Sequence, residues 1–364
     1  MFVYGIMDIM REVQPYMPSN FYDGGKLLSM KDIDGDRPTI YMSTSNRCAG
    51  KTTYFTGLLI NKFIKTQERF IVLYRWKKEL NEVSSKIFEN VAFRFPDYSM
   101  SEKKREKGSF SELFLKHGNS KDTCGYAVAL NGSDDLRKAS GELSSVQRMF
   151  FDEFQSESNK YCPNEVEKFL SIYTTVARGG GQQARYLPVY MCSNPVTLLN
   201  PYFAAMDVAS RLRKDTKFLR GPGWVLEQNV NESAQNAMRK SGIAKAMGGS
   251  RYMEYAASGT YLLDDNTFIA VPDCPTYYIA TLLYDGTACA LRRGDDDVFY
   301  FGGKPDNSCP VRIAVTNDDH SLDTTSLRAN KDLMRVLRRS WDLARLRFAD
   351  LKSRDAALRA ISHV

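Results

Sequence analysis

The sequence predicts an α/β fold: a domain with a mostly parallel sheet and crossover helices, then a helical connector, then a smaller α+β domain. Short apolar or β-branched runs alternate with longer helix-permissive stretches from Thr39 to about Tyr202. Residues 201–253 are rich in Ala, Met, Arg and Lys, and strand-like runs with one long amphipathic stretch follow them. We therefore expect domains over residues 1–203, 204–255 and 256–364.

The composition is that of an ordinary globular protein: 364 residues, 43% hydrophobic, with a net charge of +7. The seven cysteines are odd in number and form no C-x-x-C pair, so neither a disulfide framework nor a structural zinc site is indicated, and a reducing compartment is expected. No apolar run is long enough for a membrane-spanning helix, and no signal peptide is indicated, so we expect a soluble protein without a membrane partner. Residues 328–364 carry ten basic and four acidic side chains, which indicates an anionic partner.

Five strands and three long helices are expected in the first half. The strands are the apolar runs Thr39–Met42, Phe70–Tyr74, Tyr126–Leu130, Arg148–Phe151 and Leu187–Met191. The helices are Lys51–Thr66, Lys77–Val91 and Pro163–Val176, the last with proline in its first turn. The charged run Ser101–Lys107 is expected to be a solvated loop or helix face.

The last part of the chain predicts a meander closed by a helix. Its three strands are Tyr277–Leu283, Ala288–Arg293 and Val298–Gly302, with a turn at Tyr284–Thr287 between the first two. The stretch Asn330–Ile361 is expected to be one amphipathic helix, because its apolar residues share a stripe and its arginines fall mostly elsewhere. Hairpins followed by a closing helix indicate a separate α+β domain.

A phosphate-binding loop (P-loop) is predicted where the first strand meets the first helix. The motif ends in Gly50, Lys51 and Thr52, and its place between strand and helix is the one it requires. Backbone N–H groups would hold the phosphates of ATP, Lys51 would add a positive charge, and the Thr52 hydroxyl would bind Mg²⁺. Ser45 replaces the usual first glycine, and the alternative is a chance Gly-Lys-Thr at a helix start. The expected nucleotide contacts are Ser45, Asn46, Arg47, Cys48, Ala49, Gly50, Lys51, Thr52 and Thr53.

An acidic pair ends the buried-type strand that is expected over Arg148–Phe151. Asp152 would hold Mg²⁺, and Glu153 would polarise the attacking water, the division of labour that phosphoanhydride hydrolysis needs. The alternative is an exposed strand end or a helix N-cap. Together, the P-loop and the acidic pair predict an ATPase with an additional strand between the two motifs.

Three further residues are candidates for contact with the γ-phosphate. Asn194 ends a strand and would sense phosphate and help place water, although Asn-Pro is also a common turn signal. Arg178 precedes three glycines and would reach the site of a neighbouring subunit; the alternative is a helix C-terminal arginine beside a glycine cap. Lys138 lies in a polar loop and is either similar in role or a solvated lysine.

With these elements in view, the chain resembles the DNA-packaging ATPases of phi-29-type podophages, which are relatives of the terminase large subunits. The resemblance spans Phe21 to about Phe348 and includes strings without general ATPase chemistry. These strings are FIVLYRWKKEL at 70–80, FPD at 95–97, FDEF at 151–154, YCPNEV at 161–166, SNPV at 193–196 and NPYF at 200–203. The P-loop lysine of the family falls on Lys51, its P-loop arginine on Arg47, and its acidic pair on Asp152 and Glu153.

The resemblance also implies how the protein would assemble. The trans-acting arginine of the family falls on Arg178, and a family lysine that completes the neighbour's site falls on Lys138 after a one-residue gap. Family members are ring-shaped motors, usually pentamers, which dock on the portal (connector) protein of a procapsid and move double-stranded DNA, some with a structural packaging RNA. The resemblance therefore implies a homo-oligomeric ring in the host cytoplasm, transiently at the portal vertex and absent from the mature virion.

The C-terminal domain resembles the ribonuclease H-like domain of terminases. In active members, carboxylates on the first strand and nearby elements bind two metal ions for strand cutting. The first strand here, Thr276–Leu283, has no Asp or Glu, and the nearby acids Asp285 and Asp295–Asp297 lie in turns. We therefore expect a vestigial nuclease fold that binds nucleic acid or the portal.

The leading hypothesis from the sequence is a Mg²⁺-dependent ATPase that drives double-stranded DNA into a viral capsid. A terminase large subunit with a working nuclease is the second hypothesis. The third is a non-catalytic nucleic-acid or portal adaptor, whose nucleotide site only stabilises the fold.

Overall fold

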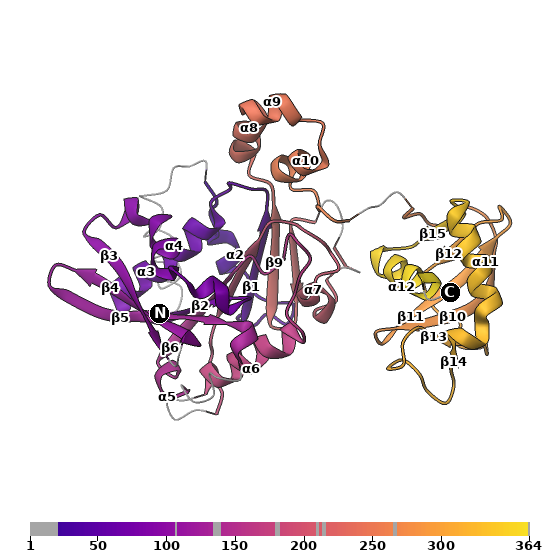
Figure 1. Ribbon diagram of the computed structural model, residues 1–364, viewed down its shortest axis with the longest axis horizontal. Coiled ribbons are helices and arrows are strands. Elements are labelled where there is room, and N and C mark those ends of the chain that lie inside the picture. Colours follow the sequence, from indigo (N-terminus) through magenta and orange to yellow (C-terminus); the bar gives the residue numbers. More distant parts are fainter. Residues whose placement is uncertain are drawn as a thin grey trace. The chain divides into compact units, whose positions relative to one another are not determined.

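The computed structural model describes residues 21–362 except 106–107, 134–139, 179–182, 209–210, 213–215 and 265–267. The chain divides into two compact units (Figure 1). The first comprises residues up to Met206 together with Leu212–Leu262, and the second comprises Asp207–Arg211 and the chain from Leu263 onward. None of the helices in the described part of the chain has the length and apolar character that a membrane crossing needs.

The first unit contains nine strands and the helices around them within its described residues. The strands are β1 (Ile40–Ser45), β2 (Arg69–Tyr74), β3 (Tyr98–Arg105), β4 (Phe110–His117), β5 (Ser120–Ala129), β6 (Val146–Asp152), β7 (Val189–Ser193), β8 (Phe218–Gly221) and β9 (Trp224–Asn229). The α-helices are α2 (Gly25–Ser29), α3 (Lys51–Thr66), α4 (Val83–Glu89), α5 (Ser140–Leu143), α6 (Glu165–Ala177), α7 (Pro201–Ala205), α8 (Glu232–Lys240), α9 (Gly242–Met247) and α10 (Arg251–Ser258). Short 3₁₀ turns are η2 (Lys77–Leu80) and η3 (Ala92–Arg94).

The strands of this unit form one mixed sheet in the order β3-β4-β5-β2-β6-β7-β1-β9-β8. The six strands from β5 to β9 in this order pair in parallel, whereas β3, β4 and β8 join by antiparallel pairing. The α/β prediction is confirmed, and β7 lies between β1 and β6. The additional strand therefore separates the strand that precedes the P-loop from the strand that ends in the acidic pair.

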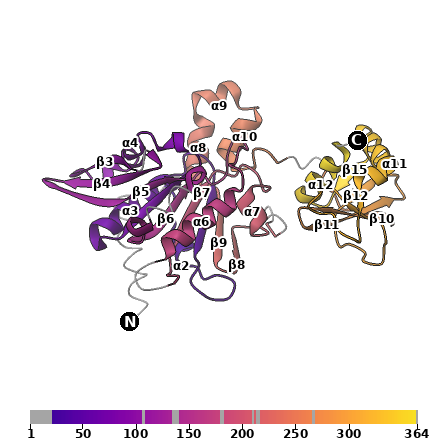
Figure 2. The ribbon, with the colours of Figure 1, turned by 60° about the horizontal axis from the view of Figure 1, so that its bottom comes forward.

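Helices cover both faces of this sheet (Figures 1 and 2). Two neighbouring residues of β6 contact helices on opposite faces. Phe150 packs on Phe55 of α3, with the ring centroids 5.8 Å apart. Phe151 points to the other face, where its ring lies 5.7 Å from that of Tyr202 in α7. Both phenylalanines are almost fully buried. Because successive side chains of a strand face opposite sides, an unbroken apolar run is what a strand with two covered faces requires.

The prediction of a helical connector over 204–255 is wrong for residues 218–229, which form β8 and β9. The run Trp224–Leu226 is buried because β9 pairs in parallel with β1 and extends the main sheet. Helical structure begins only at α8, and α8 to α10 form a small cluster at the end of the sheet (Figure 1).

Two other local predictions are corrected by the structure. The charged run from Ser101 is not a loop or helix face, because its residues up to Arg105 belong to edge strand β3, which pairs with β4. The helix predicted over Lys77–Val91 is split into η2 and α4, because Glu82 between them takes a left-handed φ of 57°.

In its described residues, the second unit is a six-stranded mixed sheet with two α-helices and a short 3₁₀ turn. Its elements are β10 (Thr276–Tyr284), β11 (Thr287–Gly294), β12 (Phe299–Phe301), β13 (Arg312–Ala314), β14 (Thr325–Ser326), η6 (Leu327–Asn330), α11 (Lys331–Asp342), β15 (Leu346–Phe348) and α12 (Leu351–Ser362). The strand order is β14-β13-β10-β11-β12-β15. The predicted antiparallel meander of β10, β11 and β12 is confirmed.

The single helix predicted over Asn330–Ile361 is wrong. It is broken between α11 and α12 by β15, which pairs in parallel with β12. Ala344 takes a left-handed φ of 56°, which ends the helical path. Leu346 and Phe348 are both fully buried on the sheet, and their two-residue spacing suits a strand. The edge of β12 therefore outweighs the local helical pattern.

Candidate nucleotide-binding site

The P-loop joins β1 to α3. Helix α3 begins at Lys51, as predicted. Gly50 is the N-cap and has a left-handed φ of 93°, a conformation that glycine takes without strain. No side chain among the described residues caps the helix, and its first turn contains no acidic residue. The N–H groups of that turn are therefore available to an anion, as a phosphate site requires.

The Lys51 ammonium group is folded into the loop. Its Nζ donates to the backbone oxygens of Ser45 (3.0 Å) and Asn46 (3.2 Å), and to the Ser45 hydroxyl (2.8 Å). Burial lowers the pKa of Lys51 to about 8. Ser45 is the last residue of β1 and pairs with Asn229, so its backbone is extended and does not require the glycine that is usual at this position.

Asp152 meets the start of α3 although it lies far away in the sequence. Its carboxylate accepts hydrogen bonds from the Thr52 hydroxyl and from the buried Cys192 thiol, the latter at 3.0 Å. Desolvation raises the pKa of Asp152. A carboxylate beside a threonine hydroxyl at a P-loop is the donor set that suits Mg²⁺, so Thr52 and Asp152 fit the metal role that the sequence predicts.

Glu153, the next residue, lines a pocket. The pocket measures about 310 Å³, and its lining includes Thr52, Asp152 and Glu153. The Glu153 side chain is exposed, but desolvation by nearby protein atoms, followed by the charges of Asp152 and Glu157, raises the pKa of this carboxyl group. A carboxylate with a raised pKa beside the residues that fit a metal role suits a general base.

Asn194, at the end of β7, lies between the P-loop and the segment after Glu153. Its side-chain oxygen accepts from Lys51 Nζ at 3.3 Å, and its Nδ2 donates to Glu157 at 3.3 Å. Glu157 is also paired with Arg47 and accepts a 2.7 Å hydrogen bond from Tyr255 in α10. Burial would raise the pKa of Glu157, but these hydrogen bonds outweigh it and lower the value. Asn194 thus contacts Lys51 of the P-loop.

The α10 helix contacts the P-loop through backbone groups. Asn46 Nδ2 donates to the carbonyls of Asn231 and Ala257, each at 3.1 Å, and its Oδ1 accepts from the Asn231 amide at 2.8 Å. The Arg47 amide donates to the Ala256 carbonyl at 3.2 Å. The predicted nucleotide contacts Asn46 and Arg47 therefore also hold the helical cluster against the loop.

Arg178 lies at the C-terminal end of α6, remote from these residues in its own chain. The side chain is exposed, and no partner is found for it in the part of the chain that the structure describes. Arg185 ties this end of α6 to the first residues of β6, because its guanidinium donates to the carbonyls of Val176 and Val146. Strand β6 starts at Val146 and ends at Asp152, so its start lies at the end of the sheet opposite Asp152. Arg178 is thus not brought to the P-loop of its own chain.

Lys138 falls within residues 134–139 and so lies outside the described residues. Cys48, Ala49 and Thr53 are in the P-loop and the first turn of α3, as predicted, and Cys48 takes a left-handed φ of 60°.

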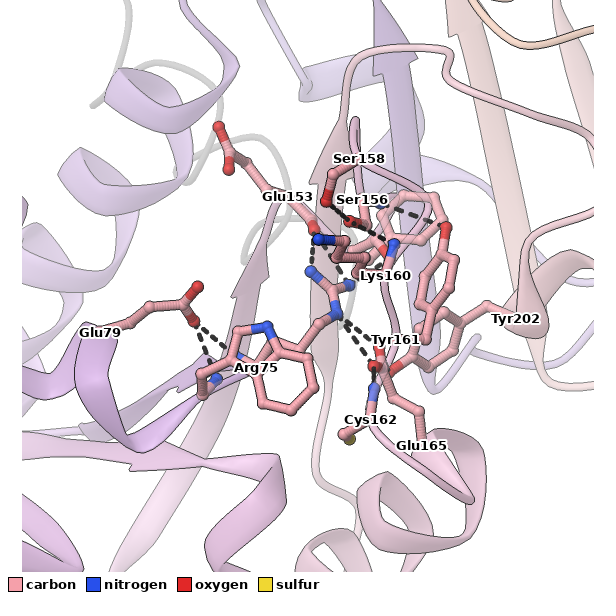
Figure 3. Close-up of polar contacts among 12 residues, drawn as sticks. Arg75, Glu79, Glu153, Ser156, Ser158, Lys160, Tyr161, Cys162, Glu165 and Tyr202 are labelled. Atoms are coloured by element: carbon pink, nitrogen blue, oxygen red, sulfur yellow. Dashed lines mark hydrogen bonds and ion pairs between the residues drawn. The ribbon is translucent and has the colours of Figure 1, made fainter.

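Sequence reasoning missed several residues around the acidic pair. Gln155 is buried, and its Oε1 accepts from the amides of Val196 (2.9 Å) and Thr197 (3.0 Å), which joins the segment after Glu153 to the one after Asn194. Arg75 and Glu165 form a buried ion pair beneath Glu153 (Figure 3). Arg75 lies in the string FIVLYRWKKEL and Glu165 in the string YCPNEV. Both strings are shared with the resembled family, and that sharing is the sequence signal that could have pointed to the two residues.

Residues 17–363 match the sequence pattern of the Podovirus DNA encapsidation protein (Gp16) family. The chain belongs to this family. The DNA packaging protein of Bacillus phage phi29 is 26% identical over 304 residues, which cover 83% of this chain and 84% of that protein. The DNA packaging protein of Bacillus phage PZA is 27% identical over 270 residues, 74% of each chain. The resemblance expected from the sequence is confirmed.

The chain is also similar in structure to a chain of the bacteriophage Phi-29 viral genome packaging motor assembly. The TM-score is 0.65 at 23% identity, and the match covers 95% of this chain and 98% of that chain. At this identity the likeness concerns the fold. It agrees with the α/β architecture described above.

Proposed function

We propose that this protein is the ATPase of a viral DNA-packaging motor, which couples Mg-ATP hydrolysis to the movement of double-stranded DNA into a procapsid. The observation that carries the ATPase proposal is the meeting of Thr52 and Asp152 at one edge of the sheet, with Glu153 next to them. Membership of the DNA encapsidation family supports the packaging role.

In this mechanism, the first-turn amides of α3 and the Lys51 ammonium group bind the β- and γ-phosphates of ATP. Thr52 and Asp152 would hold Mg²⁺, which when bound supplies positive charge to the phosphate oxygens. Glu153 takes a proton from the attacking water. Asn194, in contact with Lys51 at 3.3 Å, is placed to sense the γ-phosphate.

The test of this function is DNA-stimulated ATP hydrolysis by the full-length protein, with Lys51→Ala as the control variant. We expect the wild type to release phosphate faster when double-stranded DNA and procapsids are present. Lys51→Ala should lose ATP binding, measured with a fluorescent nucleotide, because the ammonium group that contacts the phosphates is gone. Wild-type protein that binds ATP without hydrolysing it under any of these conditions would favour the non-catalytic adaptor.

The partners proposed for the motor are double-stranded DNA, the portal protein and further copies of this chain in a ring. The fold of this chain is similar to that of a chain in the Phi-29 motor assembly, which supports the proposal of an oligomer. A pentamer, a structural packaging RNA, and a location in the host cytoplasm with transient docking at the portal vertex belong to the same proposal. Counting subunits on particles by electron microscopy tests the ring size.

For the second unit, we propose a vestigial ribonuclease H-like domain without nuclease activity. Strand β10 contains no acidic residue. Asp297 forms ion pairs with Arg293 and Arg345. Asp296 accepts a hydrogen bond from the Tyr300 hydroxyl at 2.7 Å. The competing terminase proposal has one specific observation in its favour: ligand atoms of Asp273, Cys274 and Asp296 all lie within 4.8 Å of one another, close enough to share a metal ion.

Plasmid nicking with Mn²⁺ separates these two proposals. We expect no nicking by the wild-type protein, because the first-strand carboxylate that positions water is missing. Cleavage that Asp296→Asn abolishes would instead support the terminase proposal, with Asp332→Asn on the exposed face of α11 as the matched control.

The exposed arginines of the second unit are expected to bind DNA through its phosphates. Arg338 and Arg339 are exposed on α11, and Arg345 is exposed just before β15. Charge contacts of this kind release counterions, so the affinity of the full-length protein for DNA should fall as salt rises. Replacing Arg338 and Arg339 with Gln should reduce the slope of log K against log salt by roughly 2. An unchanged slope would mean that these arginines only solvate the outer face of the helix.

A further inference from the structure

Arg75, just after β2, is a buried cation beneath the acidic pair. Only 7% of the residue is exposed. Its guanidinium donates in two directions (Figure 3). Nε reaches both carboxylate oxygens of Glu165, at 3.1 and 2.9 Å. Nη2 reaches the backbone carbonyls of Glu153, at 3.3 Å, and Phe154, at 2.8 Å. A single side chain thus joins the first residue of α6 to the backbone of the proposed general base.

Glu165 is itself fixed by groups from separate elements. It is 3% exposed. One of its oxygens also accepts from the Cys162 amide at 2.9 Å, and the other from the Tyr202 hydroxyl of α7 at 3.1 Å. Figure 3 shows these contacts around the Glu165 carboxylate. We infer that the carboxylate holds Arg75 in one orientation. Because the guanidinium is a rigid planar fork, fixing one of its sides also fixes the donors on the other.

The backbone that Arg75 binds is unusual. Glu153 has a φ of 57°, in the left-handed region that costs a residue with a side chain some energy. Here β6 ends and the chain turns sharply, so the direction of the Glu153 side chain depends on the orientation of this turn. Figure 3 shows the Glu153 carboxylate pointing away from the guanidinium that binds its carbonyl. Strained conformations of this kind persist when surrounding contacts determine them.

We propose that Arg75, held by Glu165, is a positioning residue that keeps the backbone at Glu153 in its left-handed conformation and thereby aims the Glu153 carboxylate. The catalytic consequence rests on the proposed ATPase function, whereas the structural clamp does not. The position requires arginine because the carbonyls of Glu153 and Phe154 must be bound together with Glu165. A lysine in this place has a single point of attachment and cannot bind Glu165 and both carbonyls in the same geometry.

The chain offers a matched control for this clamp. Arg148 lies at the other end of the same strand, β6, and its side chain is also largely buried. It pairs with Glu68 and donates to the Tyr190 hydroxyl at 2.7 Å. None of these contacts involves the segment after Asp152. Arg148→Lys therefore perturbs a buried ion pair of β6 without loosening Glu153.

Hydrogen exchange in the nucleotide-free, full-length protein tests the clamp without any hydrolysis. Two amides report on the segment: Phe154 donates to the Cys192 carbonyl at 3.3 Å, and Ser156 to the Tyr161 hydroxyl at 3.2 Å. We expect Arg75→Lys and Glu165→Gln to raise exchange in a peptide over residues 153–160 by about tenfold or more. Arg148→Lys should leave that peptide unchanged. The melting temperatures of Arg75→Lys and Arg148→Lys should fall by similar amounts.

The catalytic readout separates kcat from KM. A base displaced by about 1 Å loses on the order of 10²-fold in rate, so Arg75→Lys and Glu165→Gln should lose about 10- to 100-fold in kcat. KM for ATP and fluorescent-nucleotide affinity should stay within about twofold of wild type, because the P-loop is intact. Arg148→Lys should retain wild-type kcat.

Wild-type exchange over 153–160 in Arg75→Lys, or a loss of kcat no larger than in Arg148→Lys, would overturn the clamp. Should Arg75→Lys fail to fold, Glu165→Gln decides alone, since it keeps size and shape and removes only the charge. If the wild type itself hydrolyses no ATP, the proposed function fails. The exchange comparison then still decides the clamp.

Discussion

Glu153→Gln is expected to bind Mg-ATP with wild-type affinity and to hydrolyse it about 10²- to 10⁴-fold more slowly. The amide keeps the shape of the carboxylate but cannot accept a proton from water. Lys51 and the first turn of α3, which would contact the phosphates, are untouched. Fluorescent-nucleotide titration and phosphate release, measured on the same preparation, check the two halves of this prediction.

Two variants define what this result means. Glu167→Gln, on the exposed face of α6, removes a carboxylate outside the pocket and should behave as wild type. Asp152→Asn should be inactive for another reason, since the Thr52 and Asp152 pair that fits Mg²⁺ is broken. Turnover at the wild-type rate in Glu153→Gln would show that another group is the base.

Arg178→Ala is expected to bind ATP almost normally and yet to lose about 10³- to 10⁵-fold in turnover when assembled, the range of known arginine fingers. The positive charge of a guanidinium on the γ-phosphoryl group matters most in the transition state, so ATP binding should change little. Phosphate release by assembled rings, alongside nucleotide titration, is the measurement.

The geometry of the chain argues that Arg178 would act on a neighbour. Helix α6 begins at Glu165, beneath the acidic pair, and its thirteen residues extend away from it. At 1.5 Å per residue, this places Arg178 about 20 Å from that start. Arg185 holds this far end of α6 at the opposite edge of the sheet through the carbonyls of Val176 and Val146. Arg185 is thereby occupied and is a poor alternative finger.

Mixed rings make the prediction decisive. Arg178→Ala subunits keep an intact Glu153, and Glu153→Gln subunits keep an intact Arg178, so an interface between the two restores one complete site. We expect mixtures to recover turnover above either variant alone. Mixing Glu153→Gln with Lys51→Ala is the control, because no interface in that ring joins ATP binding to an intact base. Mixed rings without recovery would contradict action in trans.

The sequence by itself determined the features that rest on local patterns. The P-loop lies between a strand and a helix that begins at Lys51, and both could be predicted because the glycine, the lysine and the apolar periodicity are neighbours in the chain. The acidic pair could be located because it ends a buried strand. That Asp152 lies beside Thr52 also followed, since parallel strands of such a sheet end at one edge.

Only the tertiary structure decided the contacts that join distant segments. Arg75 and Glu165, like Glu157 and Tyr255, are ordinary charged or polar residues in their local sequence, and only the fold brings each pair together. The same holds for β9 and β15, which lie in stretches whose sequence predicts a helical connector and a long helix, respectively. Each became a strand because an open sheet edge offered backbone hydrogen bonds and burial for side chains such as Leu226 and Phe348. Such long-range gains outweigh weak local helix preference, and no local pattern reports them.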